Sequence, residues 1–183
     1  MCIRDRARLL AQNLAVGDLL ILTGDLGAGK TCFTQGLGSG LGVTDRITSP
    51  TFTLASRYQG RLLLHHLDAY RLDTLGEALD LDLPELLDSG VTVVEWGELL
   101  TPVLPDEHLL IAIEYQPVEP DTSRPASDSN HESVDEPSTE NTEEVRLLRM
   151  VANGQRWVSL LPAIASAYRA HGYLDNATSE TAQ

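Results

Sequence analysis

Residues 19–31 read Leu19-Leu20-Ile21-Leu22-Thr23-Gly24-Asp25-Leu26-Gly27-Ala28-Gly29-Lys30-Thr31. They combine an apolar strand, a glycine-rich turn and a Lys-Thr pair that opens a helix. The turn meets the pattern G-x-x-x-x-G-K-[ST] in full, in which backbone N–H groups surround phosphate oxygens, the lysine neutralises them and the hydroxyl ligates Mg²⁺. The stretch therefore predicts a phosphate-binding loop, or P-loop, between a buried strand and a helix.

The residues expected to bind phosphate follow from that pattern. Lys30 is the only lysine among the 13 basic residues of the chain, and its compact charge suits a phosphate better than the planar fork of an arginine. A flexible glycine turn that contains Lys-Thr by chance is the alternative, which the strand, loop and helix order disfavours. The predicted nucleotide contacts are Asp25, Leu26, Gly27, Ala28, Gly29, Lys30, Thr31 and Cys32.

Length and composition bound the kind of protein. A chain of 183 residues with 42% apolar content predicts one domain with a genuine core. No run approaches the roughly 18 apolar residues that a membrane span needs, and Met1–Arg6 leads into no signal-peptide core. The two cysteines give neither a disulfide framework nor a metal-binding spacing. We expect a cytoplasmic protein with no membrane association.

The net charge of −14 is concentrated in one segment. Residues 117–144 hold nine acidic residues against one arginine and are rich in Pro, Ser, Thr and Asn. Such a composition predicts a disordered acidic insertion, with an acidic docking segment as the alternative. We expect residues 1–116 plus 145–170 to form a single P-loop domain and residues 171–183 to form a flexible tail. The chain offers no basic stripe, which argues against tight direct binding of nucleic acid.

The remaining apolar patterns predict an α/β fold. A P-loop-type sheet with a parallel core and antiparallel hairpins would be flanked by helices. One hairpin is expected around Gln59-Gly60 and another around Asn153-Gly154. We expect helices over residues 5–13, 30–41, 74–80, 84–88 and 164–168, and strands over residues 19–23, 52–58, 61–67, 91–95, 109–115, 145–152 and 156–160.

Two acidic residues come at strand ends, where P-loop proteins keep groups that bind Mg²⁺ or orient water. Asp68 follows one strand, and Glu95 ends a β-branched run typical of a strand buried on both faces. Glu95 therefore fits a Walker-B-like metal position better than Asp68. Trp96 either packs over the site or fills the core. His65 and His66 have no third ligand at zinc spacing, so we expect one to face solvent and one to pack.

Residues 46–54 place hydroxyl groups around a proline, as Ser49-Pro50-Thr51 followed by Phe52 and Thr53. Near a Mg-nucleotide such a segment resembles a switch whose hydroxyl senses the γ-phosphate. The alternative is a plain Ser-Pro turn that starts a strand whose threonines reflect β-propensity. Spacing alone favours the plain turn.

The four motifs together carry a resemblance to a known family. They are Gly24–Thr31, Ser49–Leu54, His66–Leu72 and Glu95-Trp96. In this order and form they closely resemble the TsaE (YjeE) family of bacterial ATPases, which are needed for tRNA threonylcarbamoyladenosine modification. The resemblance covers roughly residues 8–116.

Three features depart from the family. Residues Met1–Arg6 are unlike the usual start of its members, so we expect a truncated or foreign N-terminus. Cys32 stands where a second threonine is common, and the family has a compact connection where this chain has residues 117–144.

The resemblance implies a protein that binds ATP with Mg²⁺ and hydrolyses the ATP slowly until partners activate it. It implies Lys30 and Asp68 as catalytic residues, Thr31 and Glu95 as metal ligands, and Thr51 as a nucleotide contact in the switch segment. The implied partners are TsaD and TsaB, with tRNA reached only through their complex. A small-molecule or nucleoside kinase and a non-hydrolysing nucleotide-dependent scaffold are the alternatives. A GTPase is disfavoured further, because a chain with one lysine has no N-K-x-D motif.

Overall fold

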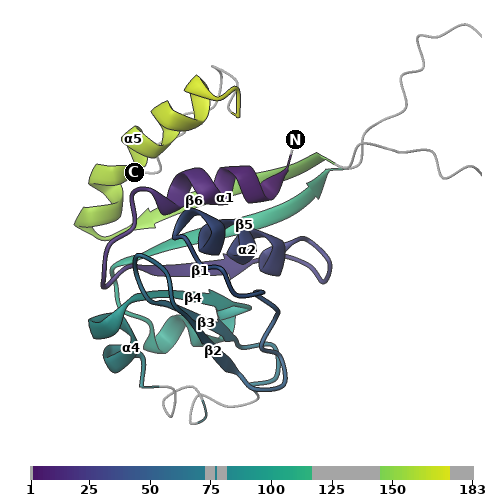
Figure 1. Cartoon of the computed structure of the whole chain (residues 1–183), viewed down its shortest axis with the longest axis vertical. Helices are drawn as coiled ribbons and strands as arrows, with labels where there is room; N and C mark the ends of the chain where they lie inside the picture. Colours follow the sequence, from purple (N-terminus) through teal and green to yellow (C-terminus); the bar gives the residue numbers. More distant parts are fainter. Residues whose placement is uncertain (1, 73–76, 78–81, 117–144, 174–183) are drawn as a thin grey trace, which may run out of the picture.

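A computed structural model describes residues 2–72, 77, 82–116 and 145–173 of the chain (Figure 1). Six strands form one sheet in the order β2-β3-β4-β1-β5-β6. The strands are β1 Leu19–Thr23, β2 Ala55–Tyr58, β3 Leu64–Asp68, β4 Val91–Glu95, β5 His108–Gln116 and β6 Val145–Asn153. The four central strands β3, β4, β1 and β5 are parallel, while β2 and β6 pair antiparallel at the two edges. The predicted α/β fold with a parallel core is confirmed.

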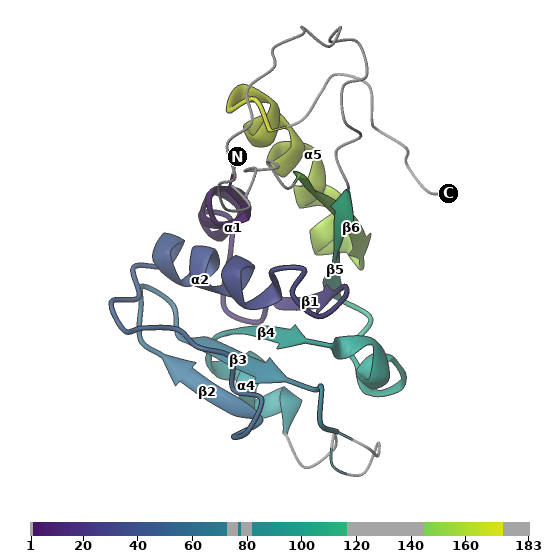
Figure 2. The same cartoon turned by 90° about the vertical axis from the view of Figure 1, so that its right-hand side faces the viewer.

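The described helices divide between the two faces of the sheet. They are α1 Ile3–Ala11, α2 Lys30–Gly40, α4 Leu83–Ser89, α5 Gln155–Ala170 and the 3₁₀ helix η1 Gly97–Val103. One core packs α1, α2 and α5 against the sheet, and a second core packs α4 and η1 against its other face. Figure 2 shows α1 beside α2, with α5 beyond it. In the described part of the chain, no helix combines the length and apolarity required to cross a membrane.

Strands β1 and β4 are buried on both faces, and for β4 this is the two-sided burial that its β-branched run predicts. Leu20 and Leu22 of β1 belong to the core beneath α1 and α2, whereas Leu19 and Ile21 belong to the core beneath α4 and η1. Every residue of β4 is buried. Two-sided burial is the reason these strands consist of continuous apolar runs without polar alternation.

The predicted hairpin around Asn153-Gly154 is wrong. Residues 155–170 form the 16-residue helix α5, and β6 pairs with β5. Gly154 has φ +85° and ends β6 where the helix begins, and the N–H of Arg156 donates to Glu107 Oε1 at 2.7 Å. Trp157, Ile164 and Tyr168 are the buried residues of α5, and their spacing is that of a helical stripe.

A second difference concerns the start of β2, predicted at residue 52. The N–H groups of Thr53 and Leu54 both donate to Pro50 O, at 3.0 and 2.7 Å, and Leu54 has φ +63°. Residues 51–54 therefore form a turn, and the strand begins at Ala55. Three predicted segments lie wholly or mostly outside the described residues. They are the helix over 74–80, of which residue 77 alone is described, the insertion 117–144 and tail residues 174–183.

Helix α2 is rich in glycine because α1 packs very closely against it. A Cβ atom on Gly40 would lie 2.6 Å from both Ala11 Cβ and Arg8 O. A Cβ on Gly36 would lie 2.8 Å from Ala7 Cβ. The glycines thus lower the intrinsic helix propensity of α2 but allow the backbones of the two helices to approach.

An ion pair between the half-exposed Arg156 and the buried Asp18 ties α5 to the turn before β1. Asp18 is 1% exposed, and both of its carboxylate oxygens accept hydrogen bonds from the Arg156 guanidinium, at 2.7 Å for Nη2. The same carboxylate accepts the N–H of Ala15 at 2.8 Å. The hydrogen bond to Asp18 raises the pKa of Arg156 above its already high value.

We predict that Gly40→Ala lowers the free energy of unfolding by about 1–3 kcal/mol, because overpacking against α1 outweighs the gain of about 1 kcal/mol in helix propensity. Urea denaturation followed by circular dichroism measures the change. Ser39→Ala, at an exposed position of the same helix, is the matched control and should be neutral or slightly stabilising. A Gly40→Ala variant as stable as this control would contradict the close packing.

Candidate functional site

The glycine-rich loop connects β1 to α2 in the predicted setting. Gly24, Gly27 and Gly29 have φ values of +129°, +82° and +112°, which side chains rarely tolerate. A Cβ atom on Gly24 would also lie 2.3 Å from Ile113 O on β5. The glycines therefore let the loop turn tightly against the sheet and present its backbone in front of the N-terminus of α2, where anions bind.

The Lys30 ammonium lies inside this loop. Its Nζ donates to Gly24 O at 2.6 Å and to Asp25 O at 2.9 Å, and it lies 3.4 Å from the centre of the Trp96 ring. Burial lowers the pKa of Lys30, while nearby carboxylates, Glu95 foremost, act in the opposite direction. Of the two alternatives for Trp96, the structure supports packing over the site.

Thr31, Glu95 and His66 form a hydrogen-bonded chain next to the lysine. Thr31 Oγ1 donates to Glu95 Oε2 at 3.0 Å, and His66 Nε2 lies 2.7 Å from Glu95 Oε1. His66 and Glu95 are 0% and 2% exposed, and His65 is also buried, so the prediction that one of the two histidines faces solvent is wrong. The structure thus joins the first residues of α2 to the end of β4 through the two residues predicted as metal ligands.

Asp68 lies beside Glu95 but has different partners. Its Oδ2 accepts the hydroxyls of Ser49 at 2.7 Å and Thr51 at 2.6 Å, and its Oδ1 accepts the N–H of Tyr70 at 3.0 Å. The segment around Thr51 is therefore folded onto the end of β3. The structure groups Asp68 with the switch-like segment and Glu95 with Thr31.

Parallel strand order explains how these side chains meet. The carboxyl ends of parallel strands share one edge of a sheet, and Asp68 of β3 is the register partner of Glu95 of β4. Backbone bonds extend this pairing past the strands, from Ala69 N to Glu95 O at 2.9 Å and from Trp96 N to Leu22 O at 3.0 Å. The ends of β1, β3 and β4 are thereby held together at the loop.

The donor atoms suit a hard cation. Hydroxyl and carboxylate oxygens, as in Thr31 and Glu95, are ligands that Mg²⁺ accepts, and Mg²⁺ beside phosphates needs only one or two protein ligands. Within the described ranges no three His, Cys, Asp or Glu side chains gather into a metal-binding cluster. The arrangement fits magnesium carried with a nucleotide, and His65, whose Nε2 lies 2.9 Å from Ser89 Oγ, takes no part in it.

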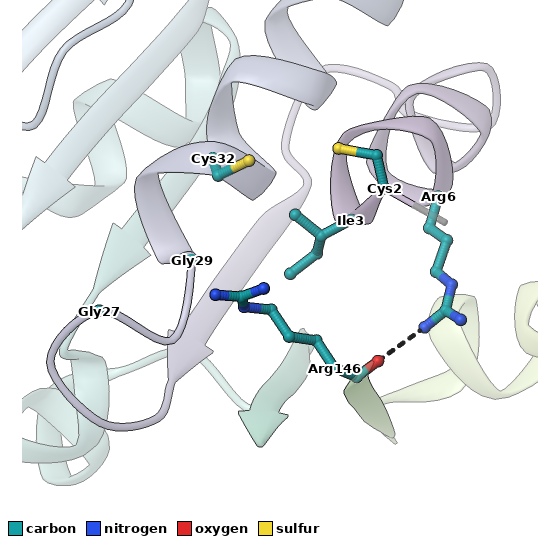
Figure 3. A pocket seen from close by; sticks show the side chains of 7 residues that line it. All are labelled: Cys2, Ile3, Arg6, Gly27, Gly29, Cys32 and Arg146. Carbon is teal, nitrogen blue, oxygen red and sulfur yellow. Dashed lines mark hydrogen bonds between the residues drawn. The ribbon is translucent and has the colours of Figure 1, made fainter. Parts of the chain in front are cut away.

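Arg146 is a residue near the loop that sequence reasoning missed. It comes from β6 and its Nε donates to Ala28 O at 3.0 Å, although 118 positions separate the two residues. It lines a pocket of about 270 Å³ between the loop, the N-terminal end of α1 and β6 (Figure 3). The lining residues are Cys2, Ile3, Arg6, Gly27, Gly29, Cys32 and Arg146. No local signal marks Arg146, because only the β5–β6 pairing brings it there.

Comparison with known proteins gives a consistent result. Residues 2–124 match the family model described as threonylcarbamoyl adenosine biosynthesis protein TsaE. The tRNA threonylcarbamoyladenosine biosynthesis protein TsaE of Treponema pallidum is 44% identical over 114 residues, which span 60% of this chain and 84% of the relative. Its namesake from Streptomyces coelicolor is 48% identical over 116 residues, spanning 61% of this chain and 78% of the relative.

A solved structure agrees with the sequence matches. The crystal structure of Bacillus subtilis YdiB is similar with a TM-score of 0.65 at 33% identity, covering 90% of this chain and 87% of the other. The resemblance predicted from the four sequence motifs is confirmed, and the chain belongs to the TsaE family.

Proposed function

We propose that this protein binds ATP with Mg²⁺ and hydrolyses it in support of tRNA N⁶-threonylcarbamoyladenosine modification. The names of its relatives support the pathway. The observation that carries the ATPase proposal is the 3.0 Å hydrogen bond from Thr31 Oγ1 to Glu95 Oε2. It joins the hydroxyl of the phosphate loop to a carboxylate at a strand end, the two protein ligands that a P-loop ATPase provides for magnesium.

The phosphate chain would bind along residues 25–32. The backbone N–H groups of the loop and the N-terminus of α2 favour an anion there. Lys30, held at the loop by its bonds to Gly24 and Asp25, supplies the positive charge. Thr31 and Glu95 would hold Mg²⁺, which neutralises charge on the phosphates.

Asp68 is the proposed catalytic carboxylate. It lies one strand away from Glu95 and is oriented by three hydrogen bonds, of which two come from Ser49 and Thr51. A carboxylate fixed in this way can orient an attacking water and accept its proton. Thr51, bonded to Asp68 in the switch-like segment, would couple that segment to the bound nucleotide.

We further propose that the protein acts in the cytoplasm on the TsaD-TsaB complex and reaches tRNA only through it. Leu26 of the phosphate loop and Phe52 of the switch-like segment are each 82% exposed. Large exposed apolar side chains on two segments of one site are suited to contact with another protein. Contact there would couple a partner to the state of the nucleotide.

The proposed activity is tested by phosphate release from ATP with and without TsaD-TsaB. We expect slow release by the protein alone and a clear increase when the partners are added, as for P-loop switches whose site is completed by another protein. Transfer of phosphate to a small acceptor, without stimulation, would favour the kinase alternative. Nucleotide binding with no release under any condition would favour the scaffold.

The phosphate-binding role of Lys30 is tested by Lys30→Ala. Loss of a buried ammonium that contacts phosphate should weaken binding of a fluorescent ATP analogue by about 100-fold or more, equivalent to about 3 kcal/mol. Fluorescence titration measures the affinity. Arg149→Ala removes an exposed cation paired with Glu114 at 3.7 Å and should bind like the parent protein. Retained affinity in Lys30→Ala would contradict the loop assignment.

The separate roles of Glu95 and Asp68 are tested by replacing each with alanine. Glu95→Ala should raise the Mg²⁺ concentration needed for half-maximal nucleotide binding by about 10- to 100-fold, because a metal ligand is lost. Asp68→Ala should leave this midpoint nearly unchanged and lower the hydrolysis rate by about 100-fold or more. The opposite pattern would make Asp68 the metal ligand.

A further inference from the structure

We propose that His66 is a positioning residue that holds the Glu95 carboxylate in the orientation required to bind the metal ion. This inference rests on the proposed function, in which Glu95 is a magnesium ligand. His66 itself has no direct contact with the metal in this proposal. Its effect is exerted entirely through Glu95.

The first support is the way the two oxygens of Glu95 are held. Oε1 lies 2.7 Å from His66 Nε2 on β3, and Oε2 accepts the hydroxyl of Thr31 on α2 at 3.0 Å. Two hydrogen bonds from two different elements fix both the position and the rotation of the carboxylate plane. Because Thr31 is itself a proposed metal ligand, His66 is the partner that can keep Glu95 in place when the Thr31 hydroxyl turns to a cation.

The second support is the isolation of the imidazole. His66 is 0% exposed, and its Nδ1 has no hydrogen-bond partner among the described residues. A carboxylate only accepts hydrogen bonds, so Nε2 carries the proton that bonds to Glu95. A buried polar atom without a partner is energetically unfavourable. The hydrogen bond to Glu95 is therefore the polar contact that the structure shows for this imidazole.

The neighbouring histidine provides a contrast on the same strand. His65 is also buried, at 2% exposure, but successive residues of a strand point to opposite faces. Its Nε2 bonds to Ser89 Oγ at the end of α4, 2.9 Å away. The two adjacent histidines are thus similarly buried, but His66 bonds to Glu95 whereas His65 bonds to Ser89.

The experiment compares two amides at position 66. The amide nitrogen of glutamine reaches about as far from the backbone as Nε2, whereas that of asparagine reaches only as far as Nδ1. We therefore expect His66→Gln to keep the hydrogen bond to Glu95 and His66→Asn to lose it. The matched control is His65→Gln, a similar change in an equally buried histidine.

The readout is metal binding, separated from nucleotide binding. The affinity for MANT-ADP is measured in EDTA, and the Mg²⁺ midpoint is measured by titrating MgCl₂ into the protein with MANT-AMPPNP. His66→Asn should raise the midpoint by about 10- to 100-fold, the usual effect of losing a group that orients a metal ligand. His66→Gln and His65→Gln should stay close to the parent value, and all variants should bind MANT-ADP alike in EDTA.

Two results would overturn the proposal: an unchanged midpoint in His66→Asn with normal MANT-ADP binding, or equally raised midpoints in the two His66 variants. If His66→Asn fails to bind MANT-ADP, the His66→Gln variant alone tests the proposal. A Mg²⁺ midpoint raised tenfold in His66→Gln would then contradict it. Failure of the proposed function would look different. In that case the parent protein itself would show no binding of MANT-AMPPNP or no response to Mg²⁺.

Discussion

The site depends on the position of β4 between β3 and β1. Its parallel register with both neighbours places Glu95 opposite Leu22 on one side and Asp68 on the other. The strand is buried throughout, and a slip by one residue would exchange the side chains that face each of the two cores. The packing that stabilises the sheet therefore also aligns the two carboxylates with the glycine-rich loop.

Burial of so many charged groups is possible because each one has partners. Lys30, Asp68 and Glu95 are all less than 5% exposed, a situation that is strongly unfavourable for isolated charges. Lys30 bonds to loop carbonyls, Asp68 to two hydroxyls and a backbone N–H, and Glu95 to Thr31 and His66. The site thus consists of neighbouring hydrogen-bonded groups drawn from β3, β4, α2, the glycine-rich loop and the switch-like segment.

Local patterns in the sequence were sufficient to predict those elements whose own residues carry the signal, such as β1 and β4. The bounds of β1 and β4 match the predicted strands because each is a short apolar run between glycine or polar residues, a pattern typical of a strand buried on both faces. The contacts of Arg146 with the loop and of His66 with Glu95 join residues 118 and 29 positions apart, and only strand order determines them. The pattern after Gly154 predicts a strand where the structure has a helix, because a short apolar run carries little evidence of its period and Asn-Gly is a common hairpin turn.

The antiparallel pair β5 and β6 has a consequence for how this protein can vary. The last pair in its register is Gln116 with Val145, so the two residues that flank the 117–144 connection lie opposite one another. For a loop between fixed ends, the free-energy cost of closure rises by only about 0.6 kcal/mol for each doubling of its length. The connection can therefore lengthen, shorten or change composition during evolution at little thermodynamic cost. The pairing of β5 with β6 would still place Arg146, the second residue after the connection, against the glycine-rich loop.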